Sequence, residues 1–204
     1  MIDYHPDAPE GSVKELSSWS SIDIDIADAI LCRNTAPLVG VAFTLILRHK
    51  PARMLGREIG QGLSALVKKL RPKTIDELND KLLVYQRSKV HELTEKGHES
   101  KVQAVLDKCE CVRVFAANAS TIDELHDRVK SMFADKSHAV TLATVHKAKG
   151  LEWNRVFILN RWLMPSKWAT QPWQQRQEAH LQYVAVTRAK LDLVYITTDG
   201  YASE

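Results

Sequence analysis

The sequence predicts an α/β protein in which helices flank a parallel sheet and an all-helical segment interrupts the chain. Three observations lead to this class. Short β-branched, apolar runs, typical of strands buried on both faces of a parallel sheet, occur early and late in the chain. Segments of helical character separate these runs. Between the two groups, residues 74–135 carry helical patterns alone. We therefore expect one lobe built from residues 22–73 and 136–204, with a helical insertion at 74–135.

The first segment, residues 1–21, is expected to be a tail or linker. Pro6, Pro9 and Gly11, together with the serines that follow, break any periodicity. Residues 24–33 alternate between apolar and polar side chains and then run apolar. This pattern favours a strand that enters a buried sheet.

A buried helix and a second strand–helix pair are expected next. Asn34 and Thr35 are residue types that cap helices, so a helix is expected from there to about His49. Residues 52–55 are a candidate for a short strand, and residues 58–70 favour a helix that ends before a proline.

The insertion is expected to contain three helices. Thr74 with Glu77, and Thr121 with Glu124, have the spacing of a capping box, which marks the start of a helix. Gly97 interrupts the helical pattern between them. The expected helices are 74–96, 99–117 and 121–134.

The last part of the chain returns to strand patterns. Residues 140–145 and 155–159 are apolar and rich in β-branched side chains, as central parallel strands are. Residues 174–190 favour a helix, and residues 191–198 favour a final strand.

Composition limits the class of protein. The chain has 204 residues, of which 45% are hydrophobic and 26% are charged, values typical of a globular protein. No apolar run is long enough to cross a membrane, and the start lacks the pattern of a signal peptide. Cys32, Cys109 and Cys111 offer neither a disulfide framework nor a four-ligand zinc spacing. We therefore expect a cytoplasmic protein with no membrane partner and no metal site of its own.

The net charge of +3 is unevenly distributed. Residues 45–73 contain a single acid, Glu58, and many basic side chains. Such a block can meet nucleic-acid phosphates or can simply be a solvated helix face, and the sequence leaves both open. The basic residues are Arg48, Lys50, Arg53, Arg57, Lys68, Lys69, Arg71 and Lys73.

Two segments carry the strongest functional signal. Residues 140–159 read VTLATVHKAKGLEWNRVFIL, and residues 181–190 read LQYVAVTRAK. In this order and spacing, the pair resembles motifs V and VI of superfamily 1A DNA helicases of the UvrD/Rep type. Residues 29–38 and 51–57 are similar to the strands, helix start and glycine turn that open the conserved part of the same lobe. The resemblance implies the RecA-like, C-terminal (2A-like) lobe of such a helicase, with residues 74–135 in the place of a short 2B-like subdomain.

The resemblance implies three nucleotide-binding residues. Arg188 is implied to be the catalytic arginine of motif VI, an arginine finger that contacts the γ-phosphate of ATP and is worth about 10³–10⁵ in rate. Gly150 and Glu152 are implied to lie at the nucleotide. A glycine lets the backbone approach a ligand, and a carboxylate accepts a hydrogen bond from a ribose hydroxyl. Taken alone, Arg188 equally fits an ion pair with a carboxylate at the C-terminal end of a helix.

The resemblance also implies contacts with single-stranded DNA or a single-strand/duplex junction. Thr144 and His146 follow a predicted strand and are implied to contact the DNA backbone. Asn34 and Thr35 are candidates to reach a DNA phosphate. Taken alone, His146 equally fits a helix cap or a hydrogen bond in the core.

Some residues depart from the motifs or leave their role open. Lys147 stands where a small residue is expected, Trp153 stands where phenylalanine is commoner, and His180 replaces the usual asparagine or arginine. Three tryptophans in the following loop can stack on bases or pack beneath the loop. They are Trp162, Trp168 and Trp173.

Two parts of a helicase motor are missing from these residues. There is no G-x-x-x-x-G-K-[ST] loop to bind phosphates and no acidic strand end to hold Mg²⁺. We therefore expect ATP to be shared with an N-terminal RecA-like lobe that holds the Mg²⁺, and we expect this chain to be inactive alone. The resemblance implies 3′-to-5′ polarity and a role in DNA repair or replication. The alternatives are a non-catalytic module that binds DNA or protein, and a structural scaffold.

Overall fold

The computed structural model describes residues 10–16 and 23–197, and in this part of the chain six strands form one parallel sheet. The strand order is β1-β6-β5-β2-β4-β3, so β2 lies inside the sheet between two strands from the end of the chain. The parallel α/β class is therefore confirmed. The strands are β1 (Ser12–Leu16), β2 (Ala29–Cys32), β3 (Ala52–Met54), β4 (Val140–Thr144), β5 (Trp153–Leu159) and β6 (Ala189–Ile196).

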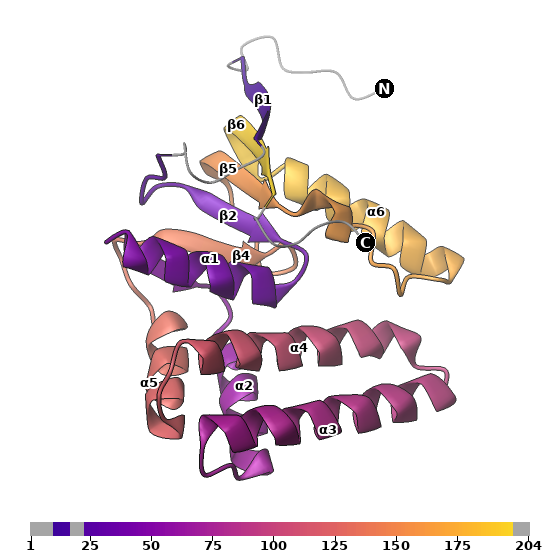
Figure 1. The fold of residues 1–204 in the computed structure, drawn as a ribbon. Helices are drawn as coiled ribbons and strands as arrows, with labels where there is room; N and C mark the ends of the chain where they lie inside the picture. Colours follow the sequence, from indigo (N-terminus) through magenta and orange to yellow (C-terminus); the bar gives the residue numbers. More distant parts are fainter. Residues whose placement is uncertain (1–9, 17–22, 198–204) are drawn as a thin grey trace.

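Helices cover both faces of the sheet (Figure 1). One face carries α6 (Pro172–Val186), and the other carries α1 (Thr35–Leu47), with the remaining α-helices packed around and beyond α1. These are α2 (Arg57–Leu70), α3 (Ile75–Glu95), α4 (Glu99–Ala117) and α5 (Ile122–Met132). A short 3₁₀ helix, η1 (Arg161–Leu163), follows β5. Among the helices that the structure describes, none is both long enough and apolar enough to cross a bilayer.

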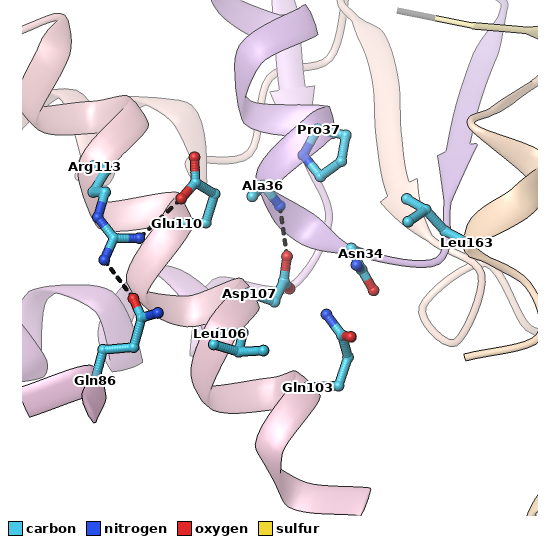
Figure 2. Close-up of a pocket in the computed structure, with 10 residues that line it drawn as sticks. All are labelled: Asn34, Ala36, Pro37, Gln86, Gln103, Leu106, Asp107, Glu110, Arg113 and Leu163. Atoms are coloured by element: carbon cyan, nitrogen blue, oxygen red, sulfur yellow. Dashed lines mark hydrogen bonds and ion pairs between the residues drawn. The ribbon is translucent and has the colours of Figure 1, made fainter. Parts of the chain in front are cut away.

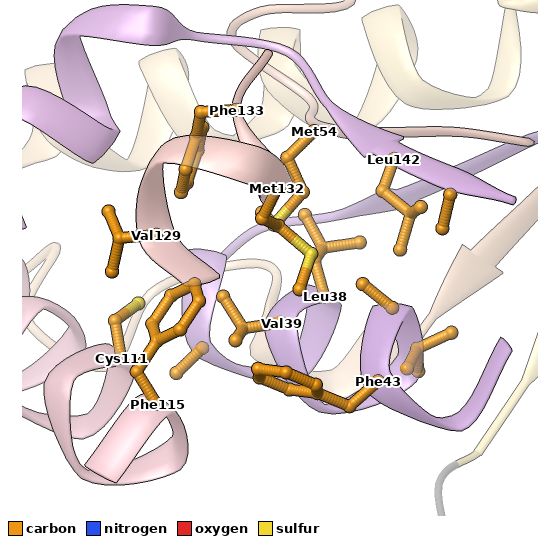
Figure 3. Close-up of a cluster of buried hydrophobic side chains, with 14 of the residues drawn as sticks. Leu38, Val39, Phe43, Met54, Cys111, Phe115, Val129, Met132, Phe133 and Leu142 are labelled. Carbon is orange, nitrogen blue, oxygen red and sulfur yellow. The ribbon is translucent and has the colours of Figure 1, made fainter. Parts of the chain in front are cut away.

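The alternation of side chains along each strand builds two cores. In β2, Ile30 packs into the cluster on the α1 face, whereas Leu31 packs into the cluster beneath α6. Both are fully buried, as expected for a strand covered on two sides. Figure 3 shows the larger cluster, in which Phe43 of α1 meets Phe115 of α4 edge-to-face at 5.4 Å between ring centroids. The helical insertion thus shares a core with the sheet.

The predicted caps of the insertion are confirmed. The Thr74 hydroxyl accepts a hydrogen bond from the Glu77 backbone N–H at 3.2 Å, and Thr121 accepts one from Glu124 at 3.1 Å. Gly97 lies in the turn between α3 and α4 with a positive φ of 66°, which explains why a glycine separates the two helices.

The predicted cap of α1 is wrong. The Asn34 side chain makes no capping hydrogen bond. Instead, the carboxylate of Asp107, on α4, accepts hydrogen bonds of 2.9 Å from the backbone N–H groups of Thr35 and Ala36. A residue about seventy positions away therefore caps this helix, which local sequence patterns do not predict.

Two boundaries near the ends of the chain also differ from expectation. Residues 12–16, within the segment expected to be a tail or linker, form β1 and pair in parallel with β6. A Cβ atom on Gly11 would lie 2.6 Å from the Leu191 carbonyl oxygen. This glycine therefore allows the two backbone segments to approach closely, and it does not mark a loop. The rest of the expected tail, 1–9 and 17–21, lies outside the described residues, as does position 198 of the expected last strand.

The helix before β6 ends earlier than predicted. We expected it to continue to Lys190, but α6 ends at Val186 and β6 begins at Ala189. The Thr187 hydroxyl donates to the carbonyl oxygens of Tyr183 and Val184, which satisfies the end of the helix. Arg188 therefore lies in the short connection between helix and strand.

Candidate functional site

The candidate residues lie at two opposite edges of the sheet. Because all strands are parallel, the residues after β2 and β4 lie at the carboxyl edge, and the residues before β5 and β6 lie at the amino edge. The carboxyl edge carries the expected DNA-binding residues Asn34, Thr35, Thr144 and His146. The amino edge carries the expected nucleotide-binding residues Gly150, Glu152 and Arg188.

A single turn, residues 145–152, connects the two edges. The Thr144 carbonyl oxygen accepts hydrogen bonds from the backbone N–H groups of Lys147 and Ala148, which begins the turn at the end of β4. Ala148 is fully buried in the core beneath α6, so the turn passes over that face of the sheet. Gly150 has a positive φ of 85° and no atom within 4 Å of a Cβ position. A glycine is thus favoured here by its backbone conformation.

Arg188 binds the end of this turn. Its guanidinium donates to the Leu151 carbonyl oxygen at 2.9 Å, to the Val184 carbonyl oxygen at 3.0 Å, and to the Thr187 hydroxyl at 3.0 Å. All three acceptors are neutral, and the side chain is half-buried. Among the described residues no carboxylate pairs with it, so the structure does not support the ion pair considered from the sequence alone.

Glu152 lies beside Arg188 at the same edge. The Trp153 backbone N–H donates to the Arg188 carbonyl oxygen at 3.0 Å, which fixes the start of β5 against the start of β6. The Glu152 carboxylate is exposed and lies 3.8 Å from the Lys190 ammonium. An exposed ion pair at this distance is weak, so the carboxylate remains available to another partner.

At the carboxyl edge, Arg33 and Glu178 form a bidentate pair. The Arg33 Nε lies 3.2 and 3.1 Å from the two Glu178 carboxylate oxygens, and Nη2 lies 2.7 Å from one of them. Glu178 also accepts a hydrogen bond of 3.0 Å from the Ser166 backbone N–H. The pair joins the end of β2 to α6 and to the loop after η1. Arg33 therefore has a structural role at this edge.

His146 and this pair line a cavity of about 240 Å³, together with Trp168 and Trp173. The Trp168 indole N–H is buried without a hydrogen-bond partner in the described structure, whereas Trp173 is largely exposed. His146 keeps contact with solvent, but burial on the cavity side lowers its pKa, and the Arg33 charge lowers it further. A neutral His146 is therefore expected at pH 7.

Glu178 remains ionised in this environment. Burial alone would raise the pKa of this carboxyl group, but the hydrogen bonds from Arg33 and Ser166 outweigh burial and lower it. The Glu178 charge in turn acts on His146 in the direction opposite to Arg33. Burial thus has the largest effect on the pKa of His146, and the Arg33 and Glu178 charges adjust it in opposite directions.

Two of the expected DNA-binding side chains are nearly buried. Thr35 is 6% exposed and Thr144 is 8% exposed, and the Thr35 backbone N–H is already bound to Asp107. Asn34 and His146 are more open to solvent. The DNA contacts remain predictions, and they fall mainly on these two residues.

One contact of the turn was missed from the sequence. The Lys147 ammonium forms an ion pair with the Glu58 carboxylate, in the first turn of α2. This pair lowers the pKa of Glu58. Only the fold brings these two residues together, because they lie about ninety positions apart in the sequence.

The basic block at residues 45–73 does not form one surface. Arg48 and Lys50 follow α1 towards the amino edge, whereas Arg57 begins α2 at the carboxyl edge. Lys50 pairs with Asp23 and Arg57 pairs with Asp135. The structure therefore favours solvated surface charges, and not a single phosphate-binding surface, for much of this block.

The cysteines and acids do not form a metal centre in the part of the chain that is described. No group of three or more His, Cys, Asp or Glu side chains in residues 10–16 and 23–197 is placed to hold an ion. All three cysteines are buried and free, and burial raises the pKa of Cys32 to about 12. Thiolate chemistry is thus disfavoured at that position.

Comparison with known proteins gives one family. A family model described as the UvrD-like helicase C-terminal domain matches residues 85–200, which is more than half of the chain. The match includes His146 at the carboxyl edge and Glu152 and Arg188 at the amino edge, but not Asn34 or Thr35. No curated protein sequence matches the chain.

Proposed function

The chain belongs to the family of UvrD-like helicase C-terminal domains, and from this premise we propose that it supplies an arginine finger and single-stranded DNA contacts to an ATP-dependent DNA helicase or translocase. As the C-terminal lobe of a UvrD-type helicase it works with an N-terminal helicase lobe. In our proposal that lobe contributes the phosphate-binding loop and holds the Mg²⁺, and this chain alone does not hydrolyse ATP.

The observation that carries the proposal is the placement of Arg188. Its guanidinium is held by neutral oxygens at the amino edge, beside Glu152 and Gly150, so its positive charge is not cancelled by a carboxylate of the described chain. A positioned cation of this kind stabilises the charge on the phosphoryl group as it is transferred. In our proposal, a phosphate oxygen replaces the Leu151 carbonyl oxygen as an acceptor for the Arg188 guanidinium.

The neighbouring residues fit the rest of a nucleotide site. The exposed Glu152 carboxylate suits a ribose hydroxyl, and the open space at Gly150 allows a ligand to approach the backbone. ATP bound here would supply the phosphoryl group whose charge Arg188 stabilises. The residues of this chain bind and orient one side of the nucleotide.

The opposite edge fits contact with a DNA strand. His146 and Asn34 are open to solvent there, whereas Thr144 and Thr35, close to them in sequence, are buried. The turn 145–152 runs from His146 to Glu152, so a shift at the nucleotide would be carried to the DNA contact through a few covalently linked residues. The resemblance favours 3′-to-5′ polarity and single-stranded DNA or a junction as the substrate.

The decisive experiment measures ATP hydrolysis, stimulated by single-stranded DNA, by this chain together with its N-terminal lobe. We expect Arg188→Ala to lower the rate by at least about 100-fold, because an arginine finger contributes about 10³–10⁵. Arg188→Lys should recover little, since one ammonium does not reproduce the planar guanidinium fork. Arg176→Ala, an exposed arginine on α6, is the matched control and should leave the rate unchanged.

The structural role of Arg188 requires a separate check, because the side chain also binds Leu151. Thermal unfolding should show that each variant lowers the free energy of unfolding by much less than the total stability of the lobe. If both lobes are folded and bound to each other, yet hydrolysis is unaffected by Arg188→Ala, the arginine-finger proposal is wrong. Absence of hydrolysis even with the wild-type chain would favour the non-catalytic binding module.

A further inference from the structure

A second cavity at the carboxyl edge lies between the lobe and the helical insertion. Its volume is about 570 Å³, within the range of about 300–1,000 Å³ that is usual for small-molecule sites. Three separate parts of the chain line it: the start of α1, the facing sides of α3 and α4, and Leu163 of η1. Figure 2 shows these residues around one common space.

Carboxamide side chains give this cavity its chemical character. Asn34, Gln86 and Gln103 come from three different helices or helix ends and all line the cavity. The Asn34 side chain makes no capping bond, and the Gln103 side chain has no hydrogen-bond partner among the side chains that the structure describes. Figure 2 shows the amides of Asn34 and Gln103 directed towards the same space. Two amides therefore present free donors and acceptors to a ligand.

The charges in the cavity disfavour a phosphate. The lining includes two carboxylates, Asp107 and Glu110, against one guanidinium, Arg113. Arg113 already donates to the Glu110 carboxylate and to the side-chain Oε1 of Gln86, and Asp107 already accepts from N–H groups at the start of α1. An anion would meet net negative charge and no free cation of this lining, so the ligand should be neutral.

The apolar part of the lining fits a flat ring. Pro37, Leu106 and Leu163 present aliphatic surface beside the amides. Bases taken out of a stack are held in this way, between apolar side chains and with polar groups at their edges. Asparagine and glutamine carboxamides pair with two adjacent atoms of adenine, which makes adenine the best match.

We propose that this cavity binds one unpaired nucleobase of the DNA strand, with adenine preferred, through the carboxamides of Asn34 and Gln103. The inference rests on the proposed function, because the DNA strand brings the base to this edge. It assigns a base contact, in place of a phosphate contact, to Asn34. It also gives the helical insertion a role, since Gln103 and Gln86 belong to α4 and α3.

Binding to the cavity is tested first with a free nucleoside. Adenosine is titrated into the ¹⁵N-labelled chain while the side-chain amide signals of Asn34, Gln86 and Gln103 are followed by NMR. We expect these signals to move and saturate, and Gln103→Leu to weaken adenosine binding about tenfold, as expected for one lost base contact. Gln61→Leu, an exposed glutamine on α2 outside this cavity, is the matched control.

Deoxyribose 5-phosphate, which lacks a base, serves as the second probe. It should leave the three amide signals in place. The proposal is wrong if adenosine moves none of these signals, or if deoxyribose 5-phosphate moves them equally well.

A second measurement separates this proposal from the proposed function. Fluorescence anisotropy compares a short oligodeoxyadenylate with an abasic strand of the same length. We expect tighter binding of the strand that carries bases, and loss of that difference in Gln103→Leu with little change for the abasic strand. Equal affinity for the two strands overturns the base site but leaves DNA binding intact. Failure to bind either strand overturns the DNA contact, and the adenosine titration then decides whether the cavity takes a base.

Discussion

At the scale of single residues, Asp107 decides how the insertion is attached to the lobe. It is largely buried, and its carboxylate caps α1 from α4. Burial raises the pKa of this carboxyl group despite the hydrogen bonds from Ala36 and Thr35. The cap is therefore stabilising as a hydrogen bond and costly as a buried charge.

These two effects predict losses of different size for two substitutions. Asp107→Ala removes the acceptor and should lower the free energy of unfolding by about 0.5–2 kcal/mol, as loss of a helix cap does. Asp107→Asn keeps an acceptor oxygen without the charge and should cost less. Urea unfolding at pH 7 measures both, and equal losses in the two variants would show that the charge, not the hydrogen bond, matters.

The same carboxyl group gives a pH dependence with a defined sign. Because its folded-state pKa is raised above the ordinary 3.8, its stabilising contribution is present below pH 3.8 and is lost as pH rises through the folded value. The stability of Asp107→Asn relative to wild type should thus be higher at pH 7 than below pH 3.8. Unfolding curves at the two pH values check this, and an unchanged difference would exclude a raised pKa.

His146 offers a third prediction at this scale. Its pKa lies below the ordinary 6.5, through burial first and the Arg33 charge second. Arg33→Gln should therefore raise the pKa of His146, and Glu178→Gln should lower it, because the Glu178 charge acts in the opposite direction. NMR titration of the histidine ring protons measures both shifts, and shifts of the same sign would contradict the assigned charges.

At the scale of elements, α6 links the two edges of the site. Glu178 binds Arg33 near the carboxyl edge, and Arg188 follows ten positions later at the amino edge. From Glu178 to the end of the helix at Val186, eight steps of 1.5 Å amount to about 12 Å along the helix. The helix thus holds the nucleotide-binding and DNA-binding edges at a fixed separation.

The buried carboxylate in the middle of α6 should respond to acid. The pKa of Glu178 lies below the ordinary 4.5, so its contribution to stability is present above pH 4.5 and is lost as pH falls through the folded value. In Glu178→Gln, the free energy of unfolding should therefore depend less on pH in this acidic range. At pH 7 the variant should lose stability near the lower end of the roughly 3–5 kcal/mol seen for broken buried pairs, since Arg33 keeps 19% exposure. Chemical unfolding between pH 3 and pH 7 provides the measurement. If the stability of the variant depended on pH as that of wild type does, the prediction would be wrong.

The sequence predicted elements that carry local signals and missed those that depend on distant partners. Capping boxes located the starts of α3 and α5, and apolar runs located β4 and β5. β1 was missed because its neighbour, β6, lies at the other end of the chain. The α1 cap was misassigned for the same reason. The motifs named the candidate site residues, but the division of these residues between two edges follows only from the parallel topology.

At the scale of the whole molecule, the insertion is attached more firmly at one end than at the other. Val112 and Phe115, late in α4, are buried in the shared core. Towards the start of α4, the 570 Å³ cavity and a second cavity of about 270 Å³ both reach Asp107. The turn between α3 and α4 projects beyond the carboxyl edge (Figure 1).

This arrangement predicts unequal local stability. Backbone amides around Phe115 should exchange with solvent at least about 100-fold more slowly than those around Gly97, because packed segments open far less often than exposed ones. Hydrogen–deuterium exchange followed by mass spectrometry tests this, with α5 as an internal reference. Equal protection at both ends of α4 would mean that the insertion opens as one unit.

Finally, the parallel pairing of β1 with β6 has a consequence for the behaviour of shortened chains in solution. Ser12 and its neighbours pair with the backbone hydrogen-bonding groups along one side of β6. The Ser12 hydroxyl also donates a hydrogen bond of 2.5 Å to the Asp192 carboxylate. A chain that began at Ile24 would leave β6 as a bare edge, able to add a strand from another copy. Its mass by light scattering should then rise with concentration while the mass of the 204-residue chain stays constant, because β1 covers this edge of β6 and prevents self-association.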